Sequence, residues 1–305
     1  MKYLSLFSGI GGFEVGIRNS APEWECIGYS EINKNSIEVY KSHFPNHINY
    51  GDIAKIQPDQ IPDFDILTGG FPCQSYSIAG LRRGLDDPRG QLFFEILKII
   101  SHKKPKCIFL ENVKGLASHD DGQTRWYIEQ KIRECGYKVF SKVLNSADYG
   151  IPHNRERLYF VCFRNDLSVS EFNFPEAIPR YHSFKDFLEA NPPDYVFLKA
   201  HQIRKIKGIG ATNAFGGYLS DGLTYNCITA SYSVDGGNSM KFFREGKVSA
   251  LSAIECERLQ AFPDNWTGIL PLRHRYKTLG NAVTTNVIGK IAEEIDFTIR
   301  KNKVV

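Results

Sequence analysis

Short apolar runs alternate with helix-like stretches up to about residue 165, and this alternation limits the possible folds more than any other feature. The apolar runs are expected to form buried strands, at residues 3–6, 26–30, 65–68, 107–110 and 158–163. The stretches between them carry helical spacing, at residues 13–19, 34–43, 91–101 and 125–135. Strands that alternate with helices in this way predict an α/β fold with a doubly wound, mostly parallel sheet.

The second half of the chain has a different pattern. Residues 172–248 contain prolines, glycines, aromatic residues and short β-like pieces such as 225–232, without a sustained helical period. We therefore expect residues 1–171 and 275–305 to form the α/β domain, and residues 172–274 to form a smaller, loop-rich domain. A helix-like run at 277–295 is expected to pack back on the α/β domain.

Composition narrows the class of protein but not its function. The chain has a net charge of +4 and a pI near 8.5, which suits nucleic acid and also suits other anionic ligands. Its seven cysteines form no Cys-x-x-Cys pair and are expected to be free thiols, and the eight histidines show no metal-ligand spacing, so no metal site is expected. There is no signal-peptide layout and no apolar run of the roughly 20 residues that span a bilayer, so we expect a soluble, cytoplasmic protein without membrane contact.

A glycine-rich turn follows the first predicted strand and opens the first predicted helix. Gly9, Gly11 and Gly12 allow the backbone to approach a ligand closely, and the helix start offers unpaired amide groups. Glu31 ends the second strand, where an acidic residue can accept hydrogen bonds from a ribose, and Asp52 is expected to follow a third strand. Each feature alone is equally explained by a tight turn or a solvated acid, but together they predict an adenosine-containing cofactor. The spacing is not Gly-x-Gly-x-x-Gly, which weakens a nicotinamide interpretation.

One cysteine differs from the others in its surroundings. Cys73 lies in the sequence Gly-Phe-Pro-Cys-Gln after the strand at 65–68, and Pro72 stiffens the turn before it. A lone cysteine is usually structural, but the neighbours of Cys73 are loop residues, so a nucleophilic role is favoured here. The polar, glycine-punctuated stretch at 80–90 is suited to act as a moving lid.

Charged residues follow the later strands at the same predicted edge. Glu111 emerges after the strand at 107–110, which suggests a general acid beside the thiol. Arg155 and Arg157 are two positions apart and are expected to point to one face, although an edge strand with solvated charges explains them too. These groups suit methylation of cytosine: the thiolate adds to carbon 6, Glu111 engages nitrogen 3, and an arginine holds the carbonyl oxygen while carbon 5 takes a sulfonium methyl. A stacked base is out of reach, so it must be flipped out of the duplex.

These motifs, in their order and over nearly the whole chain, resemble the bacterial DNA (cytosine-5) methyltransferases of restriction-modification systems. The resemblance implies the S-adenosylmethionine-dependent methyltransferase fold and S-adenosyl-L-methionine as the cofactor. It also implies Cys73, Glu111, Arg155 and Arg157 as catalytic residues. The implied cofactor contacts are Phe7, Ser8, Gly9, Gly11, Gly12, Glu31, Ile32, Asp52, Ile53, Pro72, Leu92, Asn281 and Ala282.

The resemblance also assigns the DNA-binding parts. Contacts to the flipped base or the DNA are implied for Phe71, Pro72, Gln74, Ser77, Arg89, Asn112 and Thr229. The loop-rich domain at 172–274 is then the target recognition domain, with basic residues that can reach bases or phosphates. These are Arg180, Lys199, Arg204, Lys205, Lys207, Lys241 and Arg244.

The chain shows two departures from the family pattern. His153 stands where the family often has Gln, and Ala250 and Ile254 stand where arginines are usual before Glu255. We expect the contact made by the missing arginines to come from Lys247 or Arg258.

The implied partner is double-stranded DNA, with a cognate restriction endonuclease acting separately and the enzyme acting as a monomer. Three alternatives remain: a methyltransferase for tRNA cytosine, a nicotinamide-dependent oxidoreductase, and a non-catalytic nucleic-acid-binding module. The DNA recognition sequence is not fixed by one sequence, because base readout depends on loop geometry.

Overall fold

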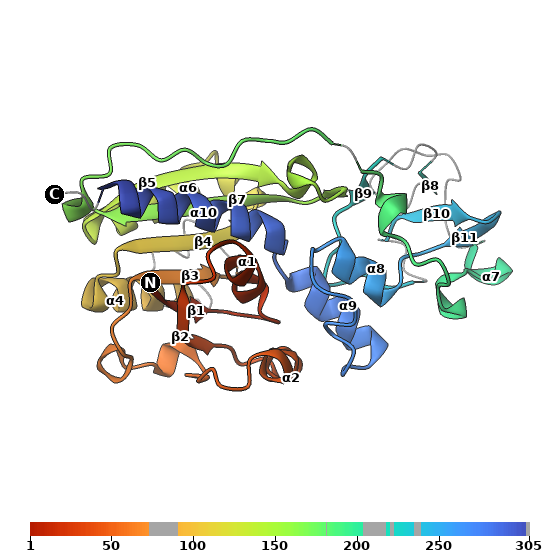
Figure 1. Cartoon of the computed structure of the whole chain (residues 1–305), viewed down its shortest axis with the longest axis horizontal. Helices are drawn as coiled ribbons and strands as arrows, with labels where there is room; N and C mark the ends of the chain where they lie inside the picture. Colours follow the sequence, from red (N-terminus) through yellow and green to blue (C-terminus); the bar gives the residue numbers. More distant parts are fainter. Residues whose placement is uncertain (73–90, 181, 204–217, 220–222, 235–238, 303–305) are drawn as a thin grey trace. The chain divides into compact units, whose positions relative to one another are not determined.

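The computed structural model describes residues 1–72, 91–180, 182–203, 218–219, 223–234 and 239–302. By its internal contacts the chain divides into two compact units (Figure 1). Unit 1 comprises Met1–Leu144, Glu156–Glu176 and Val287–Val305. Unit 2 comprises Asn145–Arg155 and Ala177–Asn286. In the described part of the chain, no helix combines the length and apolar character needed to cross a membrane.

Unit 1 is built on a six-stranded sheet with the strand order β2-β1-β3-β4-β7-β5. The strands are β1 (Lys2–Leu6), β2 (Glu25–Ser30), β3 (Ile66–Gly70), β4 (Cys107–Val113), β5 (Tyr137–Asn145) and β7 (Glu156–Arg164). Neighbours from β2 to β4 pair in parallel, whereas β7 runs antiparallel to β4. This mostly parallel sheet confirms the predicted fold class. The loops after β1 to β4 and the start of β7 therefore share one edge of the sheet, where ligands of such folds bind.

Helices cover both faces of this sheet. They are α1 (Gly12–Ser20), α2 (Lys34–His43), α4 (Gln91–Lys103), α5 (Gly115–Ser118), α6 (Gln123–Glu134) and α10 (Thr285–Asn302). Short 3₁₀ helices η1 (Ile53–Lys55), η2 (Pro58–Gln60) and η4 (Asn165–Leu167) lie in the connections. The alternation of strands and helices read from the sequence is therefore present.

The two faces of the sheet bury different layers. On one face Leu4, Ile108 and Phe160 join a buried apolar cluster with Ile96 of α4 and Ile128 of α6. Residues one position along each strand point to the opposite face, because side chains alternate along a strand. Removal of this apolar surface from water is the main stabilising contribution to the unit.

Helices α1, α2 and α10 cover the second face. Phe13 of α1 contacts Phe109 of β4 with ring centroids 5.1 Å apart, and Tyr40 of α2 stacks on Tyr29 of β2 at 3.8 Å. A Cβ at Gly289 of α10 would lie 2.5 Å from a side-chain oxygen of α1, so these two helices pack closely. The end of the chain thus returns to the α/β unit, as predicted.

Unit 2 has shorter elements. Its strands are β6 (His153–Asn154), β8 (Tyr218–Leu219), β9 (Tyr225–Asn226), β10 (Lys241–Arg244) and β11 (Lys247–Ser249). Its helices are η3 (Ser146–Tyr149), η5 (Phe184–Phe187), η6 (Asp194–Val196), α7 (Ala200–Ile203), α8 (Ala253–Arg258) and α9 (Leu272–Asn281). Strands β10 and β11 form an antiparallel hairpin, and β8 pairs in parallel with β10.

The unit boundaries and the C-terminal helix differ from the sequence-based expectations. Residues 145–155 and 275–286 make their contacts within unit 2, although the sequence pattern placed them in the α/β domain. The helix-like run at 277–295 is two helices, because α9 ends at Asn281 and α10 begins at Thr285. Near the end of α9, Gly280 packs directly against the backbone of Thr229. A Cβ on Gly280 would lie 2.1 Å from that backbone, so only glycine permits this contact.

Candidate functional site

The loop after β1 is held in a conformation that needs glycine. Gly9 and Gly11 have φ values of +56° and +88°, in the left-handed region that glycine adopts readily. Gly11 has a second constraint, since a Cβ would lie 2.8 Å from the ring of Phe44. The chain thereby turns sharply from β1 into α1, and the backbone of the loop stays accessible at the edge of the sheet.

Glu31, at the end of β2, fastens this loop to the start of α2. Its Oε2 accepts a hydrogen bond from the Gly9 amide at 2.9 Å. Its Oε1 accepts from the amides of Ile32 at 2.8 Å and Asn33 at 2.7 Å. An ionised carboxylate has about four acceptor positions, so three backbone bonds leave capacity for a ligand hydroxyl. Glu31 is therefore oriented before any ligand arrives.

Asn49 extends this network and was missed by the sequence analysis. Its Oδ1 accepts from the Gly51 amide at 2.9 Å, and its side-chain amide donates to the carbonyl of Glu31 at 3.1 Å. Asp52 accepts from the amide of Ala54 at 3.0 Å and so caps η1. The expected strand before Asp52 is wrong, since the structure has only an isolated bridge between Asn49 and Tyr29 there. An asparagine in a loop gave no pattern from which this linking role could be read.

Open space lies beside this network. A Cβ built on Gly9 or Gly51 would meet no atom within 4 Å, so open space lies beside both glycines. Ile32 is 68% exposed, which leaves an apolar side chain next to the Glu31 carboxylate. Carboxylate acceptors, an apolar side chain and accessible loop backbone are the chemistry that a ribose and an adenine require.

The ends of β3 and β4 and the start of β7 bring together a second set of side chains. Glu111 and Arg157 form an ion pair, with Oε1 and Nε 3.1 Å apart and both side chains largely buried. Asn112 donates its side-chain amide to the carbonyl of Phe71 at 3.0 Å, which holds the end of β3 beside the end of β4. A Cβ on Gly70 would lie 3.2 Å from Oε2 of Glu111, so glycine leaves room for the carboxylate.

Arg155 behaves differently from Arg157 although only one residue separates them. It belongs to unit 2, is 3% exposed, and donates to the carbonyls of Ile228 at 2.9 Å and Gly280 at 3.3 Å. It also donates to the carbonyl of Ala282. The predicted single face for the two arginines is not what the structure has, because the chain passes from β6 into β7 between them. Arg155 thus joins the 228 segment to the end of α9.

Comparison with known proteins identifies the chain. The family model for the C-5 cytosine-specific DNA methylases matches residues 1–296. The chain belongs to this family. It is a DNA (cytosine-5) methyltransferase, as its resemblance to the bacterial restriction-modification enzymes implied.

Curated relatives of this methyltransferase cover almost its full length. The Type II methyltransferase M.HhaI of Haemophilus parahaemolyticus is 35% identical over 98% of this chain and 95% of its own. M.NlaX of Neisseria lactamica is 38% identical over 96% of both chains. Among solved structures, a substituted DNMT2 of Spodoptera frugiperda matches with a TM-score of 0.79 at 22% identity, covering 98% and 99% of the two chains. The Entamoeba histolytica methyltransferase EhMeth matches with a TM-score of 0.78 at 20% identity, covering 100% and 99%, so both show the same fold.

Several predicted site residues of the methyltransferase lie outside the described residues: Cys73, Gln74, Ser77 and Arg89. The chain on either side of them is placed, with Phe71 buried and Pro72 and Leu92 half-buried. The other six cysteines are free thiols, and three of them, Cys107, Cys162 and Cys256, are buried. Burial raises the pKa of the thiol at Cys26 to about 12, which makes it a poor nucleophile at neutral pH.

The remaining predicted site residues are placed as follows. In unit 1, Phe7 is half-buried, Ser8, Gly12 and Ile53 are buried, and Asp52 is half-buried. In unit 2, Thr229 and Asn281 are exposed, whereas Ala282 is buried. His153 is buried, and its Nε2 accepts from the amide of Ile228 at 2.9 Å.

Not all basic residues of unit 2 are exposed at the surface. Lys241 and Arg244, predicted to be available for DNA, are only 1% and 8% exposed. Arg180 pairs with Asp148 at 2.6 Å, and Lys199 is exposed. The predicted Arg204, Lys205 and Lys207 lie outside the described residues. For Lys241 and Arg244 the expectation is wrong, because both side chains are buried, with the Ser239 hydroxyl and the Glu255 carboxylate as their respective partners.

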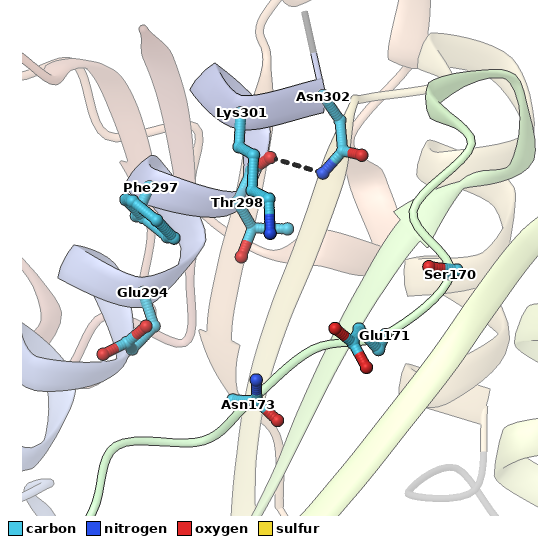
Figure 2. A pocket seen from close by; sticks show the side chains of 8 residues that line it. All are labelled: Ser170, Glu171, Asn173, Glu294, Phe297, Thr298, Lys301 and Asn302. Atoms are coloured by element: carbon cyan, nitrogen blue, oxygen red, sulfur yellow. Dashed lines mark hydrogen bonds between the residues drawn. The ribbon is translucent and has the colours of Figure 1, made fainter.

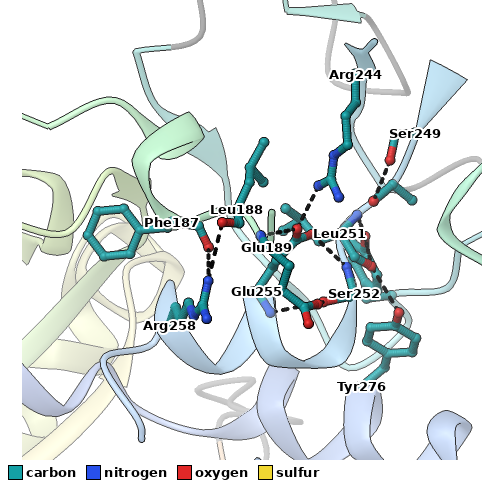
Figure 3. Close-up of polar contacts among 12 residues, drawn as sticks. Phe187, Leu188, Glu189, Arg244, Ser249, Leu251, Ser252, Glu255, Arg258 and Tyr276 are labelled. Atoms are coloured by element: carbon teal, nitrogen blue, oxygen red, sulfur yellow. Dashed lines mark hydrogen bonds and ion pairs between the residues drawn. The ribbon is translucent and has the colours of Figure 1, made fainter. Parts of the chain in front are cut away.

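Arg244 supplies a buried cation to Glu255 of α8. Figure 3 shows its guanidinium directed at Glu255, with Nη2 and Oε1 2.6 Å apart. Glu255 also accepts from the amides of Glu189 and Ser252. Two residues were expected to make the contact of the missing arginines. Of these, Arg258 pairs with Asp264, and the Lys247 ammonium lies 5.3 Å from the ring centroid of Phe197.

A cavity of about 150 Å³ lies at the opposite edge of unit 1 (Figure 2). It is lined by Ser170, Glu171, Asn173, Glu294, Phe297, Thr298, Lys301 and Asn302. The 170–173 segment follows β7, whose end pairs with Cys107 at the start of β4. The cavity therefore lies toward the amino ends of the parallel strands and is not part of the cofactor site.

Proposed function

We propose that this enzyme transfers a methyl group from S-adenosyl-L-methionine to carbon 5 of a flipped-out cytosine in double-stranded DNA, through a covalent adduct of Cys73 at carbon 6. The observation that carries the proposal is the Glu111–Arg157 ion pair at the edge where β3 leads to Cys73. An acid and a cation held together there suit the negative charge that an attacked pyrimidine ring spreads over nitrogen 3 and the carbonyl oxygen.

The cofactor is assigned to the network at the ends of β1 and β2. Glu31 would accept from the ribose hydroxyls, Phe7 and Ile32 would contact the adenine, and Asp52 would accept from its amino group. The remaining predicted cofactor contacts are Ser8, Gly9, Gly11, Gly12, Ile53, Pro72, Leu92, Asn281 and Ala282. The open space beside Gly9 and Gly51 supports this assignment. When bound, S-adenosylmethionine supplies the electrophilic methyl group that the activated carbon 5 accepts.

The chain's own residues would carry the rest of the reaction. The Cys73 thiolate adds to carbon 6 of the cytosine, and the electron pair of the 5,6 double bond moves into the ring. Glu111 delivers a proton or a hydrogen bond to nitrogen 3, and Arg157 donates to the carbonyl oxygen, so both stabilise that charge. Loss of the carbon 5 proton then expels the thiolate and restores the ring. Phe71, Gln74, Ser77, Arg89, Asn112 and Thr229 are proposed to hold the base and the DNA.

Arg155 takes a positioning role in this proposal. Its donors point at the carbonyls of Ile228, Gly280 and Ala282, so it would hold the segments that carry Thr229 and Asn281. Charged hydrogen bonds of a buried arginine contribute more than neutral ones, which suits a fixed support.

The test is methyl transfer from labelled S-adenosylmethionine to duplex DNA and, in parallel, to tRNA. Transfer to duplex DNA at carbon 5 of cytosine, located by bisulfite sequencing, is the expected result and gives the recognition sequence. Transfer to tRNA alone would overturn the substrate assignment.

The curated relatives are named Type II methyltransferases, which supports a role in restriction-modification. We propose that the enzyme acts as a monomer and protects its site from a separate endonuclease of the same specificity. DNA methylated by the enzyme should resist that endonuclease, and the enzyme should elute as a monomer in gel filtration. Cleavage of methylated DNA, or a stable dimer, would contradict this part.

A further inference from the structure

Helix α9 of unit 2 presents two cations that play no part in its packing. Arg273 and Lys277 are both exposed and lie four positions apart, so their side chains share one face of the helix. Within the described part of the chain, neither side chain forms an ion pair or a hydrogen bond. Two neighbouring cations without an internal partner form a basic patch that attracts an anionic ligand.

The other charged residue on the same helix shows the contrast. Arg275 donates to the carboxylate of Glu257 at 2.9 Å and to the hydroxyl of Thr267 at 3.0 Å. This pair is largely buried and fixes α9 within unit 2. Helix α9 thus carries one largely buried, structural arginine and two cations that are exposed at the surface.

Helix stability does not account for Arg273. It occupies the first turn of α9, where the positive end of the helix dipole disfavours a cation. Its presence is explained if it serves an anion that also benefits from the positive helix end.

The surface next to these cations belongs to a segment already implicated in DNA binding. The backbone of Thr229 and Ala230 packs against Gly280 at the end of α9, on the side of the helix adjoining Lys277. Thr229 and Ser231 are exposed, and their hydroxyl oxygens lie 3.0 Å apart. Hydroxyls beside arginine and lysine are the common ligands of DNA phosphates.

We infer that the exposed face of α9, formed by Arg273 and Lys277, binds the phosphodiester backbone of the DNA substrate beside the 229–231 segment. This inference rests on the proposed action on double-stranded DNA. It adds two cations to the seven basic residues that the sequence analysis assigned to DNA, of which Lys241 and Arg244 are buried. Contacts of this kind position the duplex and do not read its bases.

The test is the salt dependence of binding to a fluorescently labelled duplex of mixed sequence. Each phosphate contact that is lost lowers the slope of log affinity against log salt by about one. We expect Arg273→Gln and Lys277→Gln each to lower the slope by about one, and the double variant to lower it by about two. Affinity should fall by roughly tenfold for the double variant, equally for any DNA sequence.

Thermal unfolding separates a binding role from a structural one. The double variant should melt no lower than the wild type, since neither side chain supports the fold and Arg273 opposes the helix dipole. Lys290→Gln is the matched control, because Lys290 is an exposed lysine of α10 paired with Glu293, and it should leave the slope unchanged.

Two results would overturn parts of the account independently. An unchanged slope in the double variant, with a wild type that methylates duplex DNA, contradicts only the role of α9. A wild type that does not methylate duplex DNA contradicts the proposed function, whatever the slope.

Discussion

The two units use buried and half-buried charge in different ways. In unit 1, Glu31, Glu111 and Arg157 converge on the carboxyl edge of the sheet, where they lie beside open space or at a strand end that leads to Cys73. In unit 2, Arg244 and Glu255 pair in the interior and tie β10 to α8. The same residue types are thus proposed to serve chemistry in one unit and give internal support in the other.

The difference comes from the backbone that carries the charges. In a parallel sheet the carboxyl ends of successive strands lie side by side. Polar residues that follow these strands therefore come together at the end of the sheet instead of inside it. The short strands of unit 2 do not bring successive strand ends together in this way, and Arg244 finds its partner on a packed helix, α8. Position on an element therefore predicts the role of a charge better than residue type does.

The largest expected effect is on the acid at the edge of unit 1. Glu111→Gln keeps the shape of the side chain but removes the carboxyl group that can hold and release a proton, so kcat should fall by roughly 10²–10⁴-fold. Binding of S-adenosylmethionine should persist, because Glu111 is not among the predicted cofactor contacts. Single-turnover kinetics and a cofactor titration check both; a kcat within a few-fold of wild type would remove Glu111 from the mechanism.

The corresponding change in unit 2 should affect stability instead of chemistry. Arg244→Ala leaves the buried Glu255 without its cation, at a cost of about 3–5 kcal/mol in the free energy of unfolding. Arg180→Ala is the matched control, since its pair with Asp148 is exposed to solvent and is worth about 0–1 kcal/mol. Chemical denaturation of both variants measures the difference, and equal losses would contradict the interior role of Arg244.

Glu14 is a buried acid of unit 1 with hydroxyl partners, whereas Glu255 of unit 2 has a cationic partner. Glu14 accepts from the hydroxyl of Tyr40 at 3.0 Å, and burial raises its pKa to about 7. Because the folded pKa is raised above the unfolded value of 4.5, its stabilising contribution is present below about pH 4.5 and is lost as the pH rises through 7. Relative to Glu14→Gln, the wild type should lose about 3 kcal/mol of unfolding free energy over this range. Parallel pH curves of the two proteins would show that Glu14 stays ionised when folded.

The smallest effect concerns two glycines with similar backbones. Gly9 and Gly246 have φ values of +56° and +74°, and a Cβ on either would meet no atom within 4 Å. Alanine at each position should therefore destabilise by about 1 kcal/mol through backbone strain. Only Gly9→Ala should also weaken binding of S-adenosylmethionine, because its methyl group would enter the proposed cofactor space. Equal cofactor affinity in the two variants, measured by calorimetry, would argue against that space.

The sequence was informative where one element alone determines the outcome. Five of the six strands of unit 1 follow from apolar periodicity, whereas β5 (Tyr137–Asn145) was not predicted. Glu31 and Glu111 were found because they come at the ends of predicted strands. Asn49 and Arg244 were not found, because their roles depend on partners 18 and 11 residues away in the sequence, which periodicity does not reveal. The family resemblance implied the activity, but the inward orientation of Lys241 and the split between Arg155 and Arg157 required the three-dimensional structure.

The most direct test of the account is methyl transfer by Cys73→Ser. The change replaces the thiol with a hydroxyl that is far less nucleophilic and leaves the proposed cofactor network untouched. The account predicts that nearly all turnover on duplex DNA is lost while S-adenosylmethionine binds with wild-type affinity. Methylation by this variant at the wild-type rate would contradict a covalent role for Cys73 and the mechanism built on it.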